Sequence, residues 1–384
     1  MSQVRFVRRC YNCGAILQSK DPKKEGYIPP EFLSHPLDEV LFCNHCYKET
    51  HYNPLPLEPE VDPDFLLMLD DARASDALIV YVVDCTSFES SFNQAITQRI
   101  KSLRILVLAN KRDLMPKEVK DEDLAIYVAH RFRVAELPVQ KEQVILAALT
   151  TLGDVRSIAE KIEEERKRHD VYIIGPTRSG KSLFFTAFLR NYSNASGLNI
   201  TTSTYPGTNL KVMQIPLDGS SFLYDTPGTS IKNTVTGVVE PECLRSIQIS
   251  SPLKARSLDL GKNDVIFIGG LAGIELTDLG ESKGGKVNLR AFFSSDVTVK
   301  KVSIRKDLGA AFEKYLSNGQ LHPRSTQIKS MKDLDIFDFT IDEEGSRDLG
   351  IAGLGWINFV GGKQTFRVYV PKGVSVYGSR CKVK

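Results

Sequence analysis

The stretch GPTRSGKS, Gly175 to Ser182, has the residue types and spacing that hold the phosphates of a nucleoside triphosphate. It follows the apolar run VYII and precedes a helix-like stretch, so backbone N–H groups of the loop and the helix N-terminus are expected to face phosphate oxygens. Lys181 is expected to bridge the β- and γ-phosphates and to serve catalysis, and Ser182 to place its hydroxyl on Mg²⁺. The other predicted phosphate contacts in this loop are Gly175, Thr177, Ser179 and Gly180.

A second motif, DTPG from Asp225 to Gly228, follows the apolar run SFLY. Asp225 at the end of a strand is expected to hold Mg²⁺ through a water molecule, and the Gly228 amide to sense the γ-phosphate.

A third motif, NKRD from Asn110 to Asp113, is expected to read the nucleotide base. The Asp113 carboxylate can accept the N1 and N2 hydrogens of guanine, which adenine does not offer, so the predicted ligands are GTP and GDP. Asn110 is expected to brace neighbouring loops, and the Lys111 stem to pack on the purine. The last predicted base contacts are Ala147 and Ala148, with the Ala148 amide donating to the guanine O6.

The base motif precedes the phosphate motif in this chain, although the two must grip opposite ends of one nucleotide. Apolar runs alternate with helix-like stretches, which indicates an α/β domain with a parallel sheet covered on both faces. Because domain termini often lie close together, such a sheet can be cut and rejoined elsewhere. The sequence predicts a circularly permuted P-loop GTPase domain, with the charged helix Val155 to Arg168 as the joint.

Four cysteines near the start form two pairs, each with two residues between its members. This spacing lets both thiolates of a pair face one ion, and two pairs complete the tetrahedron that Zn²⁺ accepts. A reducing compartment favours this interpretation over disulfides, and the remaining cysteines, Cys85, Cys243 and Cys381, are expected to be buried or inert. The predicted zinc ligands are Cys10, Cys13, Cys43 and Cys46.

The 384 residues suggest more than one domain, and 42% hydrophobic and 25% charged residues are typical of globular proteins. The predicted domains are a zinc module (residues 1–55), the GTPase domain (56–235) and a mainly β C-terminal domain (236–384). The longest apolar run, Ala77 to Val83, is far shorter than the roughly 20 residues of a membrane span. The first residues lack the apolar core of a secretion signal, so the expected location is the cytoplasm.

Basic residues of the C-terminal region, from Lys363 to Lys384, are accompanied by no Asp or Glu. They either face phosphate or form a solvated strand end. The interleaved aromatic residues fit an RNA-stacking surface or, equally, a strand core. They are Trp356, Phe359, Phe366 and Tyr369.

Taken together, these motifs resemble the YqeH family of bacterial circularly permuted GTPases. The resemblance covers nearly the whole chain and includes GYIPP between the cysteine pairs, GLGWINF from Gly353 to Phe359, and VPKGV from Val370 to Val374. It implies a GTPase that assists assembly of the small ribosomal subunit, with an RNA-binding C-terminal domain. The implied partners are that subunit or its precursor and ribosomal RNA, with no membrane and no DNA.

Three positions depart from the family pattern. Arg178 stands where an Asn supports potassium-assisted hydrolysis in similar GTPases, Asn209 where a Mg²⁺-binding Thr belongs, and Thr229 where a hydrophobic residue is usual. We expect Thr208 to substitute as the Mg²⁺ ligand, and the attacking water to be positioned by the backbone, by Thr229 or by the bound ribosome. The Arg178 guanidinium either replaces the monovalent cation or points to solvent.

Three functions compete on the sequence alone. The first is a slow GTP-hydrolysing assembly factor whose nucleotide state controls its grip on ribosomal RNA. The second is a nucleotide-loaded RNA-binding scaffold with little or no turnover, which Asn209 and Thr229 motivate. The third is a zinc-dependent DNA-binding regulator, although no helix-turn-helix pattern stands out.

Overall fold

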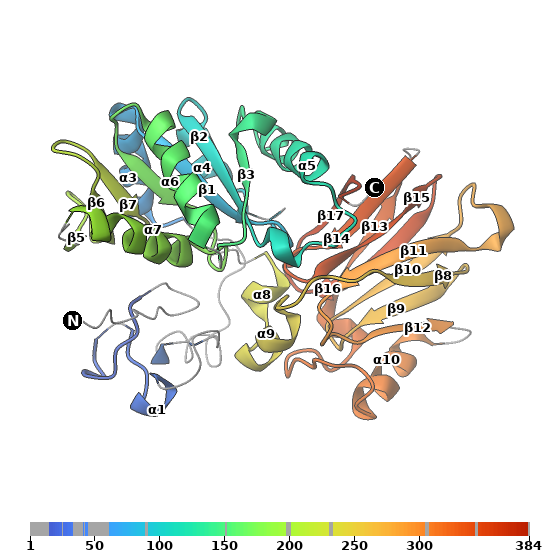
Figure 1. The fold of residues 1–384 in the computed structure, drawn as a ribbon. Coiled ribbons are helices and arrows are strands. Elements are labelled where there is room, and N and C mark those ends of the chain that lie inside the picture. The colour runs from blue at the N-terminus through green and yellow to red at the C-terminus, as the bar shows by residue number, and fades with distance from the viewer. Residues whose placement is uncertain are drawn as a thin grey trace. The chain divides into compact units, whose positions relative to one another are not determined.

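The computed structural model describes residues 15–24, 26–33, 41, 43–44, 61–88, 91–149, 152–196, 201–229, 233–303, 307–341 and 345–382. They form two compact units, which Figure 1 shows with the elements labelled. The first comprises Met1–Cys85, Ser91–Arg112 and Val128–Ile231, and the second Thr86–Ser90, Asp113–Tyr127 and Lys232–Lys384. The domain limits at residues 55 and 235 remain a prediction.

The first unit contains a seven-stranded sheet in the order β3-β2-β1-β4-β7-β6-β5. From β3 to β7 the neighbouring strands are parallel, whereas β6 pairs antiparallel with both β7 and β5. The strands are β1 (Leu78–Asp84), β2 (Arg104–Asn110), β3 (Val144–Leu146), β4 (Val171–Ile174), β5 (Thr201–Thr204), β6 (Lys211–Pro216) and β7 (Phe222–Asp225).

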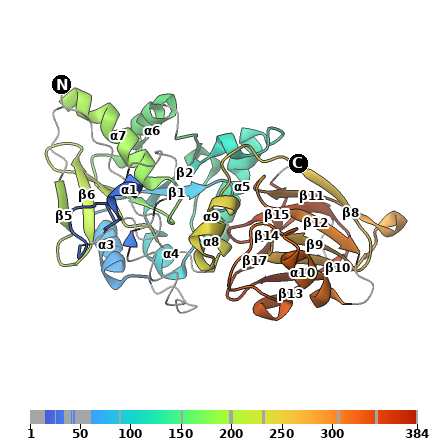
Figure 2. The same ribbon diagram turned by 90° about the horizontal axis from the view of Figure 1, so that it is seen from below.

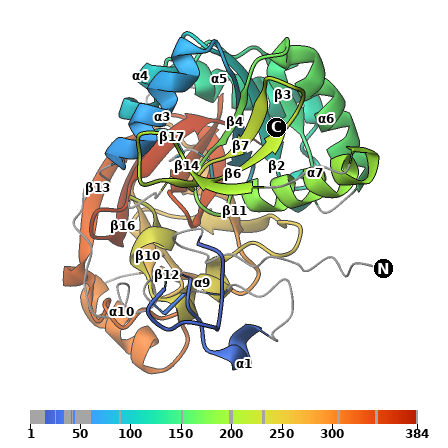
Figure 3. The ribbon, with the colours of Figure 1, turned by 90° about the vertical axis from the view of Figure 1, so that its left-hand side faces the viewer.

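Helices cover both faces of this sheet, with α3 and α4 on one side and α6 and α7 on the other (Figure 3). The continuous apolar sequence of β1 and β2 follows from this double cover, because every side chain of a central strand then meets a hydrophobic layer. On the α6 and α7 side, Val80 and Val82 pack with Phe184 and Phe188. The helices of this part are α1 (Pro30–Leu33), α3 (Pro63–Ala74), α4 (Gln94–Ile100), α6 (Leu152–Arg166), α7 (Lys181–Ser196) and the second half of α5 (Asp121–Val134), whose first half belongs to the second unit.

The prediction of a parallel sheet is correct for five strands and wrong for its last two. β6 and β7 are joined by residues 217–221 only, and so short a connection can link only antiparallel neighbours. The edge strand β5 was not predicted, because its sequence TTST carries no apolar run.

The second unit is mainly β, as the sequence predicts for the C-terminal part. Its two sheets have five strands each, in the orders β12-β9-β10-β16-β13 and β17-β14-β15-β11-β8. The sheets pack together, with the rings of Phe359 and Phe366 4.7 Å apart, and α10 lies against the first sheet (Figure 2). The elements are α8 (Val235–Val238), α9 (Pro241–Ile247), β8 (Arg256–Leu260), β9 (Asp264–Ile268), β10 (Ala272–Asp278), β11 (Val287–Phe293), β12 (Val299–Ser303), α10 (Leu308–Ser317), β13 (Leu334–Thr340), β14 (Gly345–Ile351), β15 (Gly355–Gly361), β16 (Thr365–Pro371) and β17 (Val376–Arg380).

The interleaved aromatic residues of this unit are core residues. Trp356 and Phe366 are fully buried, Phe359 is 2% exposed and Tyr369 6% exposed. Of the two interpretations left open by the sequence, strand core is therefore correct, and these four rings are not available to stack on RNA bases.

Three basic residues of the C-terminal region are either paired with a carboxylate or buried. Lys363 pairs with Glu281, and Arg367 makes a two-pronged ion pair with Asp338, which holds the pKa of that carboxyl below its ordinary value. Lys382 is buried, at 2% exposure. Lys372 and Arg380 are exposed, so both interpretations of the basic region remain predictions.

None of the helices in the described part of the chain combines the length and apolarity that crossing a lipid bilayer needs.

Candidate nucleotide-binding site

The phosphate-loop motif lies between the buried strand β4 and helix α7, whose first residue is Lys181. Gly175 has a φ of 143°, and a Cβ atom there would lie 2.1 Å from the Val82 carbonyl oxygen. The loop therefore leaves the sheet pressed against the backbone of β1, and only glycine fits at this position.

Lys181 points back into the loop that precedes it. Its ammonium donates to the carbonyl oxygens of Gly175 at 2.9 Å and Pro176 at 3.4 Å, and the residue is 6% exposed. The Gly228 backbone lies beside this ammonium, since a Cβ on Gly228 would be 3.0 Å from Lys181 Nζ and 2.8 Å from Thr177 Cγ2. Residues of the phosphate loop and of the DTPG motif therefore lie together beside the Lys181 ammonium.

The segment after DTPG is bound to the phosphate loop through the backbone of Thr229. The Thr177 N–H donates to the Thr229 carbonyl at 3.0 Å, and the Thr229 N–H donates to the Gly175 carbonyl at 3.2 Å. Asp225 ends β7 and is 4% exposed. The predicted role of the Thr229 side chain in positioning water is not tested by these backbone contacts.

The side chain of Asn110 joins the base motif to the phosphate loop. Its Nδ2 donates to the Ser179 carbonyl at 2.9 Å, and its Oδ1 accepts from the Leu149 N–H at 3.2 Å. Asn110 and Ser179 are 69 residues apart in sequence, and both are almost fully buried. The order of motifs in the chain therefore does not prevent them from meeting in space.

The contact between Asn110 and Ser179 requires a glycine at position 180, because Gly180 has a φ of 102° and a Cβ there would lie 2.2 Å from Asn110 Nδ2. We expect Gly180→Ala to displace the Asn110 amide, and to lower the free energy of unfolding by about 2 kcal/mol and GTP affinity by about tenfold. Chemical denaturation and nucleotide titration measure the two effects. Gly207→Ala is the matched control, since Gly207 has a φ of 74° but no heavy atom within 4 Å of the position that a Cβ would occupy. Equal losses in both variants would contradict the proposed clash.

The other two residues predicted to read the base, Lys111 and Asp113, differ in whether their side chains are held by contacts. Lys111 has a left-handed backbone, with a φ of 64°, and its ammonium pairs with Asp84 at 2.5 Å. Asp113 lies in the short helix Arg112–Leu114, with its carboxylate exposed, and belongs to the second unit. The structure thus holds Asn110 and Lys111 by side-chain contacts and leaves the Asp113 carboxylate accessible.

The loop after β3 makes a contact that the sequence motifs did not predict. The Ala147 N–H donates to the Ala109 carbonyl at 3.0 Å, but the Ala148 N–H, predicted to read the guanine O6, donates to the Asp154 carboxylate at 3.0 Å. Asp154 lies in the first turn of α6, where an acidic residue is favoured by the helix dipole. The base must therefore displace this carboxylate to use the Ala148 amide. The only sequence feature that could have indicated this contact is the Asp six residues after Ala148.

The hydroxyl of Thr208 is hydrogen-bonded within its own turn. It donates to the Tyr205 carbonyl at 2.9 Å and accepts from the Leu210 N–H at 3.1 Å, so it closes a tight turn. Tyr205 anchors this turn through its hydroxyl, 2.8 Å from that of Tyr172, and burial raises the pKa of Tyr205 to about 12. The turn must rearrange before Thr208 can reach a Mg²⁺ ion held by Ser182.

Neighbouring Asn209 is held in place by its backbone, whose N–H donates to the Asp64 carboxylate of α3 at 2.7 Å. Its side chain lines the same cavity as Lys181, whereas Thr208 is not among the described residues that line it.

One cavity collects most of the predicted phosphate and metal residues. An ammonium, a carboxylate and a hydroxyl at one opening can hold a phosphate group together with a divalent cation. The predicted residues that line it are Thr177, Arg178, Gly180, Lys181, Ser182, Asp225 and Gly228.

Comparisons with known proteins show what the chain is similar to. Residues 286–380 match the family described as YqeH-like, C-terminal. Over 371 residues, 97% of this chain and 98% of the relative, the sequence is 28% identical to the uncharacterized protein YqeH of Bacillus subtilis strain 168. The C-terminal part of the chain thus resembles YqeH-like proteins, and the similarity to the Bacillus protein extends along almost the whole chain.

Two further relatives of the chain come from plants. A protein of Oryza sativa subsp. japonica named putative nitric oxide synthase is 27% identical over 428 residues, 96% of this chain and 76% of the relative. An Arabidopsis thaliana protein named GTP-binding protein Brassinazole insensitive pale green 2, chloroplastic, is 24% identical over 392 residues, 93% and 57% of the two chains.

Of the four predicted zinc ligands, Cys43 lies within the described residues. Cys10, Cys13 and Cys46 lie outside the described residues, whereas Cys43 is 1% exposed and packs with Leu17. Within the described ranges, no three His, Cys, Asp or Glu side chains are grouped as metal ligands.

The remaining three cysteines differ in burial. Cys85 and Cys243 are buried, and burial raises the pKa of the Cys243 thiol to about 12. Cys381 is only partly buried, and its sulfur accepts from Asn358 Nδ2 at 2.9 Å.

Proposed function

We propose that this protein binds GTP and GDP and slowly hydrolyses GTP during assembly of the small ribosomal subunit. The observation that carries the proposal is the bond from Asn110 Nδ2 to the Ser179 carbonyl, because it places the base motif against the phosphate loop. The similarity to YqeH-like proteins and the name of the Arabidopsis relative, a GTP-binding protein, support the choice of nucleotide.

The same bond supports a circularly permuted GTPase fold. Strands β1 to β3 carry the base motif and come first in the chain, while β4 to β7 carry the phosphate and metal motifs and come later. All seven nevertheless form one sheet, with β1 and β4 as parallel neighbours. In this proposal helix α6 joins what were once the two ends of the domain.

The proposed chemistry divides among few residues. Lys181 neutralises charge on the β- and γ-phosphates, while Ser182 and Asp225 hold Mg²⁺, which polarises the γ-phosphoryl group when bound. Gly228 offers its amide to the γ-phosphate beside Lys181. Asp113 selects guanine, and none of the described residues lining the cavity is a free histidine or glutamate able to act as a general base.

We assign the four cysteines Cys10, Cys13, Cys43 and Cys46 to a structural zinc ion, with the protein working in the cytoplasm. The burial of Cys43 among Leu17, Ile28 and Leu41 fits a module whose small core needs a metal. We expect Cys43→Ser to abolish stoichiometric zinc and to weaken docking on the ribosomal subunit, as measured by elemental analysis and co-sedimentation. A Cys85→Ser variant should keep its zinc, and loss of zinc from both variants would contradict the assignment.

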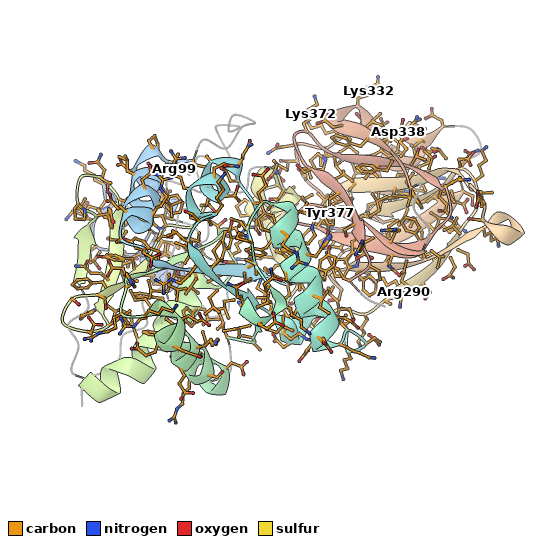
Figure 4. All side chains as sticks on the ribbon, turned by 90° about the horizontal axis from the view of Figure 1, so that it is seen from above. Arg99, Arg290, Lys332, Asp338, Lys372 and Tyr377 are labelled. Carbon is orange, nitrogen blue, oxygen red and sulfur yellow. The ribbon has the colours of Figure 1, made fainter. Side chains whose placement is uncertain are left out.

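Contact with ribosomal RNA is proposed for the second unit, through exposed charges rather than through its buried aromatic rings. Lys332 and Lys372 lie near one another at the end of the unit that also carries Asp338 (Figure 4). Phe337, at 37% exposure, follows on β13 and offers a ring that a base can stack on.

The decisive test combines binding and sedimentation. Titration of the full chain with GTP, GDP and ATP should show binding of the two guanine nucleotides and much weaker binding of ATP. Sedimentation with small ribosomal subunits should depend on which nucleotide is present. Equal affinity for ATP would overturn the proposal, and phosphate release absent in single-turnover assays, with and without subunits, would favour the scaffold.

Arg178 provides a prediction about cofactor use. It has a left-handed backbone, with a φ of 73°, a conformation that Asn adopts more readily than Arg. If its guanidinium replaces the monovalent cation, GTP turnover should be equal in sodium and potassium, while Arg178→Asn should become several-fold faster in potassium than in sodium. Clear potassium stimulation of the unmodified protein would refute the replacement.

A further inference from the structure

The segment that follows the base motif belongs to the same compact unit as the C-terminal sheets. Asp113–Tyr127 groups with Lys232–Lys384, whereas Ser91–Arg112, which contains Asn110, groups with the phosphate loop. We infer that the C-terminal sheets position Asp113 and so contribute to guanine selectivity. The inference rests on the proposed function, because it takes Asp113 as the residue that reads the base.

A backbone bond fixes the first end of this segment. The Leu253 N–H donates to the carbonyl oxygen of Leu114 at 2.9 Å, and Leu253 is 5% exposed. Leu114 directly follows Asp113 in the short helix Arg112–Leu114. A shift of the chain at Leu253 is therefore passed to Asp113 through one peptide unit.

A side-chain bond fixes the other end. The hydroxyl of Tyr127, on the first half of α5, donates to Ser379 Oγ of β17 at 2.9 Å. The Tyr127 ring is 6% exposed and meets the Phe88 ring edge-on, with centroids 6.0 Å apart. The segment from Asp113 to Tyr127 is thus held at both ends by the second unit.

Lys382 reinforces the second anchor. Its ammonium lies 4.2 Å from the ring centroid of Trp356, 5.2 Å from that of Tyr377 and 5.8 Å from that of Tyr127. The ammonium also donates to the Tyr377 hydroxyl at 3.2 Å, and the backbone N–H of Lys382 donates to the Asp348 carboxylate at 2.9 Å. Because the lysine is almost fully desolvated, its attraction to the three rings is stronger than at a surface.

The sheet that contains β14, β15 and β17 provides two of the aromatic rings around the Lys382 ammonium. Tyr377, labelled in Figure 4, lies across Gly350 on the neighbouring strand, since a Cβ there would be 2.1 Å from the ring carbon that bears the hydroxyl. Trp356 stacks on Phe292, with centroids 5.0 Å apart. The glycine on β14 therefore leaves room for the Tyr377 ring, which lies near the Lys382 ammonium, as the Trp356 ring does.

Selectivity depends on such support because the Asp113 carboxylate must meet two hydrogens of guanine at once. A displacement of about 1 Å can change the strength of a positioned interaction by about 10²-fold. Leu253, Tyr127 and Lys382 do not touch the nucleotide in this proposal. They are positioning residues, and their loss should affect recognition of the guanine 2-amino group rather than recognition of the phosphates.

The test compares dissociation constants for GTP and ITP, since inosine lacks the 2-amino group. We expect Lys382→Met in the full chain to reduce the preference for GTP over ITP by roughly 3- to 10-fold. Lys382→Arg, which keeps a cation over the rings, should retain most of the preference. Lys300→Met is the matched control, because Lys300 lies 4.5 Å from the centroid of Tyr315 on α10, outside the anchored segment.

Two further variants each remove only a hydroxyl and therefore perturb the fold less than Lys382→Met. Tyr127→Phe removes only the hydroxyl that Ser379 accepts, whereas Tyr369→Phe removes a comparable bond to Glu275 at 2.7 Å elsewhere in the unit. A reduced GTP-to-ITP preference in the first variant alone supports the inference. An unchanged preference in Lys382→Met and Tyr127→Phe, with the unmodified protein selective for guanine, overturns the inference but not GTP binding. An unmodified protein that does not prefer GTP to ATP overturns the proposed function itself.

Discussion

Replacing Asp113 by Asn should lower the affinity for GTP by about 10²- to 10⁴-fold. The carboxylate accepts two hydrogens from guanine, and each hydrogen bond to a charged group contributes about 1.5–3 kcal/mol. An Asn side chain offers one acceptor and one donor, so its NH₂ group would face the guanine amino group. Xanthine presents an oxygen at that position, so the affinity for XTP should rise in the same variant.

Calorimetric titration of both proteins with GTP and XTP measures this exchange. Glu118→Gln is a suitable control, because Glu118 is exposed and lies just beyond the base motif. A parallel loss of GTP and XTP affinity in Asp113→Asn would mean that the carboxylate supports the fold of the loop instead of reading the base.

Replacing Lys181 by Ala should abolish measurable GTP turnover and weaken GTP binding by about 10²-fold or more. The ammonium makes charge-assisted contacts with two phosphate groups in the proposed complex, and alanine makes none. The variant should remain folded, because the Gly175 carbonyl still accepts from the Thr229 N–H. Circular dichroism and phosphate release measure the two outcomes.

Lys161→Ala provides the comparison, since Lys161 lies on α6 and pairs with Glu164 and Glu165 away from the cavity. It should bind and hydrolyse GTP normally. Normal turnover in Lys181→Ala would remove this lysine from the proposed mechanism.

The central strands and their motifs were predictable because the requirements are local. A continuous apolar run such as Leu78–Asp84 must be buried on both faces, and a glycine-rich loop between a strand and a helix has few other conformations. The meeting of Asn110 with Ser179 follows from the same logic, because both residues belong to loops at the carboxyl ends of strands β2 and β4.

Contacts between distant segments could not be predicted in this way. Lys382 appears in the sequence as one more basic residue of a charged region, yet its surroundings come from residues as far apart as Tyr127 and Tyr377. Likewise the bond from Ala148 to Asp154 depends on where α6 begins relative to β3. No local pattern carries that information.

The alternation of aromatic and basic residues from Trp356 to Lys372 shows a related limit. In a strand, period-two alternation separates a buried face from an exposed one, whatever the exposed face binds. The pattern predicts burial of the aromatic rings as readily as an RNA surface, and only the pairing of two sheets decides between them.

The anchoring of residues 113–127 has a consequence for how the protein is made. Ser379, which receives the Tyr127 hydroxyl, is translated 252 residues after its partner. A nascent chain released before that point would already contain every nucleotide-binding motif but would leave the segment after Asp113 unsupported. Full discrimination between bases should therefore arise only after translation has passed Ser379, so that incomplete polypeptides bind nucleotides less selectively than the finished protein.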